Sequence, residues 1–229
     1  MKRTISQNIW LKRQKKDVFV KLSRARGYRS RAAYKLIEIN NKFKIINQNS
    51  KVIDFGCGEG SLLSELIETK DVLGYGVEIS DSKIEKCIEK GVPVIKHNID
   101  SGIDQFMQSG FDLSIMARSI QCLKDPKLAL NNMLQISKRC VVTLPNLGYW
   151  SCRINLAFGK MPVTPELPSS WYETENIHLC TIRDFENLCS NENIYIKDRI
   201  YLNKNGRQGN LASLSPNFLA VEGVYLLEK

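Results

Sequence analysis

The stretch that decides the fold is Lys51-Val-Ile-Asp54-Phe-Gly56-Cys-Gly58-Glu-Gly60. It reads as a short buried strand that ends in an acid and is followed by three glycines at alternate positions. Glycine allows the backbone to turn tightly and to come close to a ligand. The apolar spacing of residues 61–69 predicts a helix directly after the loop. This order is typical of ligand-binding α/β proteins, although a purely structural turn also needs glycine.

A second acid favours the ligand-binding interpretation. Glu78 lies in the apolar run 74–79 and follows Asp54 by 24 residues. A carboxylate at the end of that strand can accept the hydroxyl protons of a ribose. The loop itself reads G-x-G-x-G after an acid, whereas a dinucleotide-binding loop reads G-x-G-x-x-G. The spacing therefore separates this loop from the dinucleotide pattern.

The same alternation continues along the chain. Apolar runs at 92–96, 111–116 and 140–144 are separated by helical patterns, which predicts a parallel sheet with helices on both faces. Asp125-Pro126 predicts the start of one helix, and the capping box that begins at Thr181 predicts the start of another. The runs 195–202 and 219–227 predict an antiparallel pair that closes the sheet. We expect a doubly wound, mostly parallel Rossmann-like α/β domain over 51–229.

Composition narrows the class of protein. The 229 residues are 43% hydrophobic and 25% charged, which is typical of a globular chain, and no apolar run reaches the roughly 18 residues that a membrane-spanning helix needs. Seven cysteines are scattered without a C-x-x-C pair, and only two histidines are present. We therefore expect a cytoplasmic protein with reduced cysteines, no membrane segment and no metal site.

The positive charge belongs to one segment. Residues 1–50 hold 14 Lys and Arg against two acids, a net charge of +12, while the remainder carries a net charge of −3. Two helices are predicted within residues 6–43, one with its apolar residues on a single face. This basic helical extension predicts either contact with RNA phosphates or a solvated helical pair packed on the sheet. The sequence leaves both interpretations open.

The glycine loop and Glu78 resemble the corresponding motifs of class I S-adenosylmethionine-dependent methyltransferases. The resemblance implies that S-adenosylmethionine is the cofactor. It implies adenine contacts at Asn98 and Ile99, although family members often have an acid where Asn98 stands, and a place for Ala117 beside the methyl donor. The remaining cofactor-binding residues implied by the resemblance are Asp54, Gly56, Cys57, Gly58, Gly60 and Glu78.

From about residue 51 to 190 the chain more closely resembles the MetW family. The blocks that carry this resemblance are Gly74-Tyr-Gly-Val-Glu78, Pro145-Asn146-Leu-Gly148-Tyr-Trp150, Met161-Pro-Val-Thr164, Trp171-Tyr172 and Asn176-Ile-His178-Leu-Cys-Thr181-Ile-Arg-Asp184-Phe. The resemblance implies a role in methionine biosynthesis and a homoserine O-acyltransferase as partner. It does not establish a methyl acceptor, so regulatory binding and methyl transfer to a small molecule both remain open.

The N-terminal segment resembles a different family, the FtsJ-type ribosomal RNA 2′-O-methyltransferases. The resemblance is carried by Trp10-Leu-Lys-Arg-Gln, Asp17-Val-Phe-Val-Lys21 and Gly27-Tyr-Arg-Ser-Arg-Ala-Ala-Tyr-Lys35-Leu-Ile-Glu-Ile. It implies a catalytic role for Lys35 and makes RNA methylation the alternative function. The family's acidic block after the fourth strand is replaced by Ile115-Met-Ala-Arg118. Lys35 alone does not supply that catalytic set.

Residues 145–180 predict a long lid or partner loop, because they lack clean periodicity over an unusual length. His178 is the candidate catalytic base, since imidazole changes charge near neutral pH. Aromatic side chains in such a loop more often anchor it, and a single histidine is more often structural. Asp112 is interpreted as a strand-start acid that pairs locally. The other candidates for an acceptor side of the site are Asn146, Tyr149, Trp150 and Trp171.

Overall fold

The computed structural model describes residue 40 and residues 44–229, apart from 165 and 209. The two helices predicted within residues 6–43, and Lys35 with them, lie outside the described residues, Asn40 excepted. In chain order the elements are β1 (Lys51–Phe55), α4 (Ser61–Lys70), β2 (Leu73–Glu78), α5 (Asp81–Glu89), β3 (Val94–Lys96), η1 (Ile99–Ser101), η2 (Asp104–Phe106), β4 (Phe111–Ala117), η3 (Ile120–Cys122), α6 (Pro126–Ile136), β5 (Ser137–Pro145), α7 (Trp150–Ala157), α8 (Ile182–Asn191), β6 (Tyr195–Leu202), α9 (Asn210–Leu214), α10 (Pro216–Leu219) and β7 (Glu222–Glu228).

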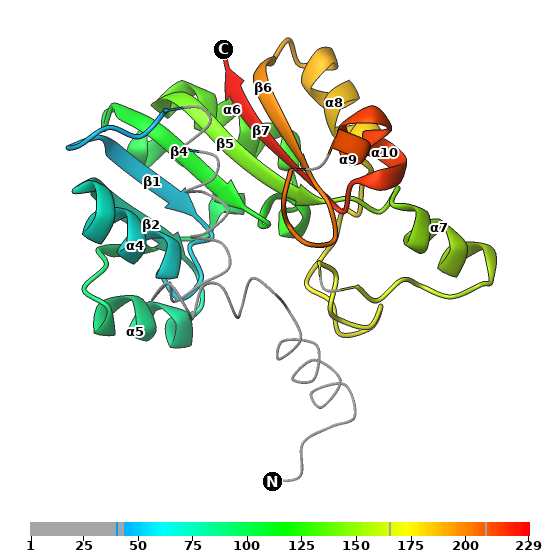
Figure 1. The fold of residues 1–229 in the computed structure, drawn as a ribbon. Helices are drawn as coiled ribbons and strands as arrows, with labels where there is room; N and C mark the ends of the chain where they lie inside the picture. Colours follow the sequence, from blue (N-terminus) through cyan, green and yellow to red (C-terminus); the bar gives the residue numbers. More distant parts are fainter. Residues whose placement is uncertain (1–39, 41–43, 165, 209) are drawn as a thin grey trace, which may run out of the picture.

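The strands form one sheet in the order β3-β2-β1-β4-β5-β7-β6 (Figure 1). Strands β1 to β5 pair in parallel, and β7 is antiparallel to both β5 and β6. The expected α/β class and the antiparallel pair at the end are confirmed. The strand order reverses between β1 and β4, so the carboxyl ends of these two strands mark the place where open α/β sheets bind ligands.

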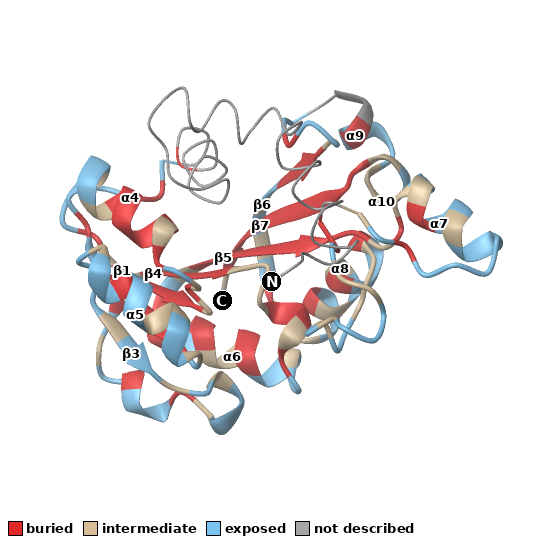
Figure 2. Cartoon of the chain, turned by 90° about the horizontal axis from the view of Figure 1, so that it is seen from below, coloured by how far each residue is buried: buried red, intermediate tan, exposed pale blue. Residues whose placement is uncertain are grey.

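Alternate residues of the central strands enter two separate cores. Ile53 and Phe55 of β1 pack with apolar residues of α6 and α8, whereas Val52 packs with Leu63 of α4 and Cys87 of α5. Figure 2 shows the buried strands between these helices. Burial on both faces explains why the strands read as continuous apolar runs.

The predicted helix starts are present at the expected residues. Asp125 Oδ1 accepts the backbone N–H of Leu128, and Pro126 occupies the first turn of α6. Thr181 and Asp184 form a reciprocal capping box at α8. The last strand begins at Glu222 instead of residue 219, because Pro216 opens the short helix α10.

Ile45 and Ile46 lie just before β1 and are buried in the core on the α4 side. Asn40 Oδ1 accepts the backbone N–H of Ile46 over 2.8 Å. The last residues of the segment 1–50 therefore pack against the sheet domain.

All seven cysteines are free thiols. Within residues 44–229 and the other described positions, no group of acidic, histidine and cysteine side chains is arranged to hold a metal ion. Among the helices that the structure describes, none has the length and apolar character needed to cross a bilayer.

Candidate functional site

The glycine loop leaves β1 through residues with positive φ. Gly56 has φ +72°, and a Cβ there would lie 2.4 Å from Ser119 Oγ, so a larger residue would clash. The backbone N–H groups of Gly56 and Cys57 donate to the carbonyl oxygen of Val77 on β2. Gly60, with φ +69°, caps the start of α4. The loop is thereby held at the carboxyl ends of β1 and β2.

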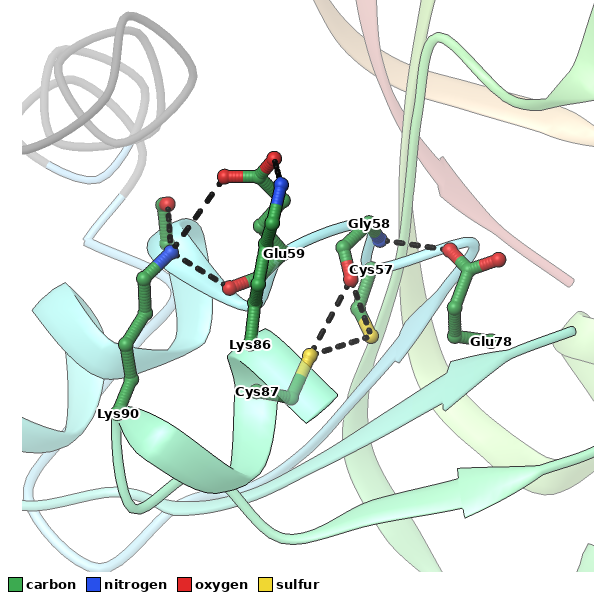
Figure 3. Close-up of polar contacts among 8 residues, drawn as sticks. Cys57, Gly58, Glu59, Glu78, Lys86, Cys87 and Lys90 are labelled. Atoms are coloured by element: carbon green, nitrogen blue, oxygen red, sulfur yellow. Dashed lines mark hydrogen bonds and ion pairs between the residues drawn. The ribbon is translucent and has the colours of Figure 1, made fainter. Parts of the chain in front are cut away.

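Glu78 closes this loop from the neighbouring strand (Figure 3). Its Oε2 accepts the backbone N–H of Gly58 over 2.9 Å. Its Oε1 accepts the backbone N–H groups of Ile79 and Ser80 at 2.9 and 3.0 Å. The side chain is 5% exposed. A carboxylate oxygen has two lone pairs, so Oε2 still has one free for a further donor such as a hydroxyl.

A second set of contacts ties the outer side of the loop to α5. Lys90 Nζ donates to the carbonyl oxygen of Glu59 over 2.7 Å and to Ser61 Oγ over 2.8 Å. The Lys86 ammonium pairs with the Glu59 carboxylate (Figure 3). Lys90 is the more buried of the two lysines, with 18% of its side chain exposed against 49% for Lys86. Lys90 therefore fixes the backbone at the start of α4.

Two thiols lie beneath the same loop. Cys57 Sγ and Cys87 Sγ are 3.9 Å apart, and Cys87 Sγ contacts the carbonyl oxygen of Gly58 over 3.2 Å. Burial raises the pKa of both thiols. They are therefore neutral packing groups, not nucleophiles.

Asp54 is the unusual group of the site. It is 2% exposed, and its Oδ1 lacks a hydrogen-bond partner among the described residues. Burial, and secondly the charge of Glu78, raises the pKa of Asp54 to about 8. A buried acceptor without a donor costs free energy, so an unpaired carboxyl at a ligand-binding edge indicates a place for a donor or a cation.

The next residues along this edge come from β3 and β4. Glu78 is paired with Lys96 in the sheet, so Asn98 and Ile99 follow directly at the same edge. Asn98 caps η1 by accepting the backbone N–H of Asp100. Asp54 is paired with Ile115, which places Ala117 beside the glycine loop.

Gln121 lies just beyond Ala117 in η3 and is 6% exposed. Its Nε2 donates to the carbonyl oxygen of Arg118 over 2.6 Å, while its Oε1 has no partner in the described part of the chain. The two unpaired buried acceptor atoms of the described residues are thus Asp54 Oδ1, near the carboxyl end of β1, and Gln121 Oε1, four residues after the end of β4. The sheet order reverses between these two strands. These two acceptor atoms therefore lie at the edge where such sheets bind ligands, which favours a ligand with N–H donors.

Comparison with known sequences agrees with this architecture. The family model described as methionine biosynthesis protein MetW matches residues 35–227. The chain belongs to the MetW family. A bifunctional methionine biosynthesis protein MetXA/MetW from Rhodopirellula baltica is 27% identical over 168 residues, which cover 69% of this chain and 27% of that relative.

A second group of relatives has a different description. Ribosomal RNA large subunit methyltransferase E from Rickettsia bellii is 49% identical over 123 residues, covering 54% of this chain and 51% of that protein. The enzyme of the same description from Rickettsia canadensis is 48% identical over 73 residues, covering 31% and 32%. The matched regions thus span about half or less of each of these relatives.

Solved structures show the same fold. A SAM-dependent methyltransferase, possibly a histamine N-methyltransferase, from Thermotoga maritima has a TM-score of 0.61 and 16% identity, covering 86% of this chain and 89% of that chain. A SAM-dependent methyltransferase from Archaeoglobus fulgidus has a TM-score of 0.62 and 14% identity, covering 89% and 96%. At these identities the likeness establishes the fold alone.

His178 stands apart from the glycine loop in its contacts. Its Nε2 lies 3.2 Å from the carbonyl oxygen of Lys124, and its backbone N–H donates to the carbonyl oxygen of Gln121. A carbonyl oxygen only accepts, so Nε2 must carry the proton in this contact. These bonds fasten residues 177–178 to Gln121 of η3 and to Lys124, and they leave the lone pair on Nδ1.

Asn146 is a structural residue. Its side chain is buried, donates to the carbonyl oxygens of Pro216, Asn217 and Ala220, and accepts the backbone N–H groups of Gly148 and Ile182. The hydrogen-bonding groups of the Asn146 amide are all occupied within the protein, so the side chain is not free to contact a methyl acceptor.

Asp112 is the local strand-start acid that its position suggested. It accepts the backbone N–H of Lys51 and pairs with Lys138, and these bonds lower its pKa. Trp150 and Trp171 are 41% and 71% exposed, so Trp171 in particular does not anchor its loop as an interior aromatic would.

Three residues of this region were not singled out by the sequence. Ile79 is 57% exposed directly after Glu78, where an apolar side chain in water offers a surface for a ligand. Gln121 and Lys90 act through contacts with residues far away in the chain. Only the apolar character of Ile79 after a strand-end acid was visible as a local signal.

Proposed function

We propose that this chain is a MetW protein of methionine biosynthesis that binds S-adenosylmethionine and acts with a homoserine O-acyltransferase. The observation that carries the proposal is the unpaired, buried Asp54 carboxyl beside a glycine loop that Glu78 holds closed. S-adenosylmethionine is a cation with an ammonium group, two ribose hydroxyls and a flat purine. Each of these parts has a suitable counterpart at this edge of the sheet.

The hydrogen-bonding groups support this assignment. The ammonium end would donate to Asp54, whose ionised form it would stabilise, and to Gln121 Oε1. A ribose hydroxyl would donate to the free lone pair of Glu78 Oε2. Ile79 and Ile99 would offer apolar surface to the purine, with Asn98 beside them. Gly56, Cys57, Gly58, Gly60 and Ala117 would allow the ligand to approach the backbone closely.

Methyl transfer to an acceptor is a further activity that we propose. When bound, S-adenosylmethionine supplies an electrophilic sulfonium methyl group. His178 Nε2 lies against the carbonyl oxygen of Lys124, whereas Asp112 accepts the backbone N–H of Lys51 and pairs with the Lys138 ammonium. A proton on Nε2 leaves the lone pair on Nδ1 of His178, so His178 stays the candidate base for an acceptor that carries a proton. Transfer would otherwise depend on alignment of the acceptor.

The partner is proposed from the Rhodopirellula relative, whose description places MetXA and MetW in one bifunctional chain. Such a chain holds its two parts at high effective concentration. We propose that the present protein makes the corresponding contact between two chains. Its free cysteines, all neutral or packed, are consistent with a reducing cytoplasm as the compartment.

Binding to the partner is tested by titrating the protein with purified homoserine O-acyltransferase, with and without saturating S-adenosylmethionine. We expect a complex, and we expect S-adenosylmethionine to change the affinity of the protein for the acyltransferase. Coupling between two ligands is reciprocal, so the acyltransferase should change the affinity for S-adenosylmethionine by the same factor. Absence of a complex under both conditions would contradict the proposed partnership.

RNA methylation is the second candidate, favoured by the relatives described as ribosomal RNA large subunit methyltransferase E and by the +12 charge of residues 1–50. We propose residues 1–50 as a basic extension that would bind RNA phosphates, with Lys35 in the catalytic role. The test is incorporation of labelled methyl groups into ribosomal RNA by the wild-type protein and by Lys35→Ala. Incorporation that Lys35→Ala abolishes would favour this candidate over the first.

A further inference from the structure

The segment between β5 and α8 forms a projecting arm, defined here as residues 148–178. Its helix α7 lies outside the layers that cover the sheet, at the far right of the molecule (Figure 1). Cys152 is the one residue of α7 that is buried. In Figure 2 most of α7 has the colours of exposed or intermediate residues. The arm therefore contributes little to the core.

The outer surface of the arm is unusually apolar. Phe158 is 78% exposed, and Trp171 and Tyr172 are each 71% exposed. Trp150 and Ile154 of α7 and its C-cap residue Phe158 recur at intervals of four residues, so they share one side of the helix. The large exposed apolar side chains of the arm include Trp150, Ile154, Phe158, Met161, Trp171 and Tyr172. Clustered exposed apolar residues mark interaction surfaces, whereas single ones are ordinary.

Hydrogen bonds hold the base of the arm in one geometry. Asn146 accepts the N–H groups of Gly148 at one end and Ile182 at the other, and the N–H of Leu147 donates to the carbonyl oxygen of Cys180. Within the arm, Arg153 Nε donates to the carbonyl oxygen of Gly148 over 2.6 Å. A surface fixed in this way loses little conformational freedom on docking.

The chemistry of the arm favours a protein over a nucleic acid. The arm carries Arg153 and Lys160 against Glu166, Glu173 and Glu175. A phosphate backbone requires an excess of cations, whereas the centres of protein interfaces are rich in Trp, Tyr, Phe and Met and poor in charge. The arm is rich in exposed aromatic residues and has no excess of cations, so its composition is that of a protein interface.

We propose that this arm is the surface that docks the homoserine O-acyltransferase. The proposal rests on the partnership given above, for which the fused Rhodopirellula relative is the support. The arm returns to the body at Ile177 and His178, whose N–H groups donate to the carbonyl oxygen of Gln121. Gln121 borders the edge where the donor is proposed to bind. Residues 177–178 thereby connect the surface that would dock the acyltransferase to the edge of the sheet that would bind S-adenosylmethionine.

The test compares two arm variants with a matched control in a binding titration against purified homoserine O-acyltransferase. The arm variants are Phe158→Ser and Trp171→Ser. The control is Tyr195→Ser, which changes an aromatic residue that is 62% exposed. Tyr195 pairs with Glu228 at the start of β6, at the opposite end of the sheet from Pro145. All three side chains are mostly exposed, so their replacement leaves the core intact.

We expect each arm variant to weaken partner binding by about tenfold or more, as for a central aromatic residue of an interface, and Tyr195→Ser to bind as the wild type does. Donor affinity measured without the partner should be unchanged in all three variants. Arm variants that bind the partner as tightly as the wild type would overturn the docking surface while leaving the partnership intact. Loss of self-association with unchanged partner affinity would show that the arm binds a second copy instead. A wild type that fails to bind would overturn the partnership itself, and the docking surface with it.

Discussion

Gly58 donates its backbone N–H to Glu78 Oε2 over 2.9 Å, which joins the loop after β1 to the last residue of β2. The two acids of the site are also coupled, because burial first and the charge of Glu78 second raise the pKa of Asp54. Glu78 therefore holds the loop in place and adds to the effect of burial on the protonation of Asp54.

Replacement of Glu78 by Gln tests this double role. The amide has one acceptor atom in place of two, so either Gly58 or the pair Ile79 and Ser80 loses its partner. A hydrogen bond to a charged group contributes about 1.5–3 kcal/mol, so S-adenosylmethionine affinity should fall by about tenfold or more. Calorimetric titration measures the change. Equal affinities of the variant and the wild type would show that Glu78 does not hold the ligand or its loop.

The pKa of Asp54 predicts how stability changes with pH. In the unfolded chain this carboxyl has its ordinary pKa of 3.8, and burial raises the folded value to about 8. The folded state therefore binds the proton more tightly, and this contribution to stability is fully present below pH 3.8 and is lost as pH rises through about 8.

Asp54→Asn removes this titration while keeping the shape of the side chain. Relative to the variant, the wild type should lose stability between pH 5 and pH 9, measured as the free energy of unfolding in urea without ligand. A difference between the two proteins that stays constant over this range would contradict the raised pKa. Asp112→Asn controls for removal of a carboxylate elsewhere on the sheet.

Lys90 and Lys86 provide a matched pair for the outer contacts of the loop. Lys90→Met removes two hydrogen bonds to Glu59 and Ser61, at about 1 kcal/mol each, and should weaken donor binding and lower stability by about 1–2 kcal/mol. Lys86→Met removes an exposed ion pair, and we expect donor affinity within about twofold of the wild type. Urea unfolding and donor titration of both variants make the comparison. Equal effects of the two substitutions on stability and on S-adenosylmethionine affinity would refute the claim that Lys90, and not Lys86, holds the loop.

Asn146→Ala tests the structural role of a residue that stands in a family block. The change leaves the buried N–H groups of Gly148 and Ile182 without their side-chain acceptor, and we expect a loss of about 3 kcal/mol or more in the free energy of unfolding. Donor affinity of the folded variant should change much less than its stability. A stable variant with lost donor or partner binding would instead place Asn146 in a binding role.

The fold was predictable because its signals are local. Continuous apolar runs such as 140–144 indicate strands buried on both faces, and Asp125-Pro126 and Thr181 with Asp184 cap their helices within four residues. The start of β7 was placed three residues too early, because Leu219 is apolar in either a strand or a short helix and only Pro216 favours the helix. Helix α7 escaped prediction because its apolar residues face outward and its N-cap, Tyr149, makes no side-chain capping bond.

The candidate site was predictable in part for the same reason. Asp54, the glycines and Glu78 are adjacent in sequence to the strands that position them. Gln121 and Lys90 depend on contacts that cross the chain, from η3 to the arm and from α5 to α4, and a single sequence gives no sign of them. The role of His178 as a base stays a prediction, since its residue type suggests it and, within the described part of the chain, its one side-chain hydrogen bond, from Nε2 to Lys124, leaves Nδ1 unused.

The most direct test of the account is a calorimetric titration of the wild type, Asp54→Asn and Asp112→Asn with S-adenosylmethionine. We expect the wild type and Asp112→Asn to bind alike and Asp54→Asn to bind at least about tenfold more weakly, because a charge-assisted hydrogen bond to the ammonium group is lost. Folding of each variant is checked by its unfolding curve. A wild type that does not bind, or a folded Asp54→Asn protein that binds as tightly as the wild type, would contradict the central claim that this edge of the sheet is built for the methyl donor.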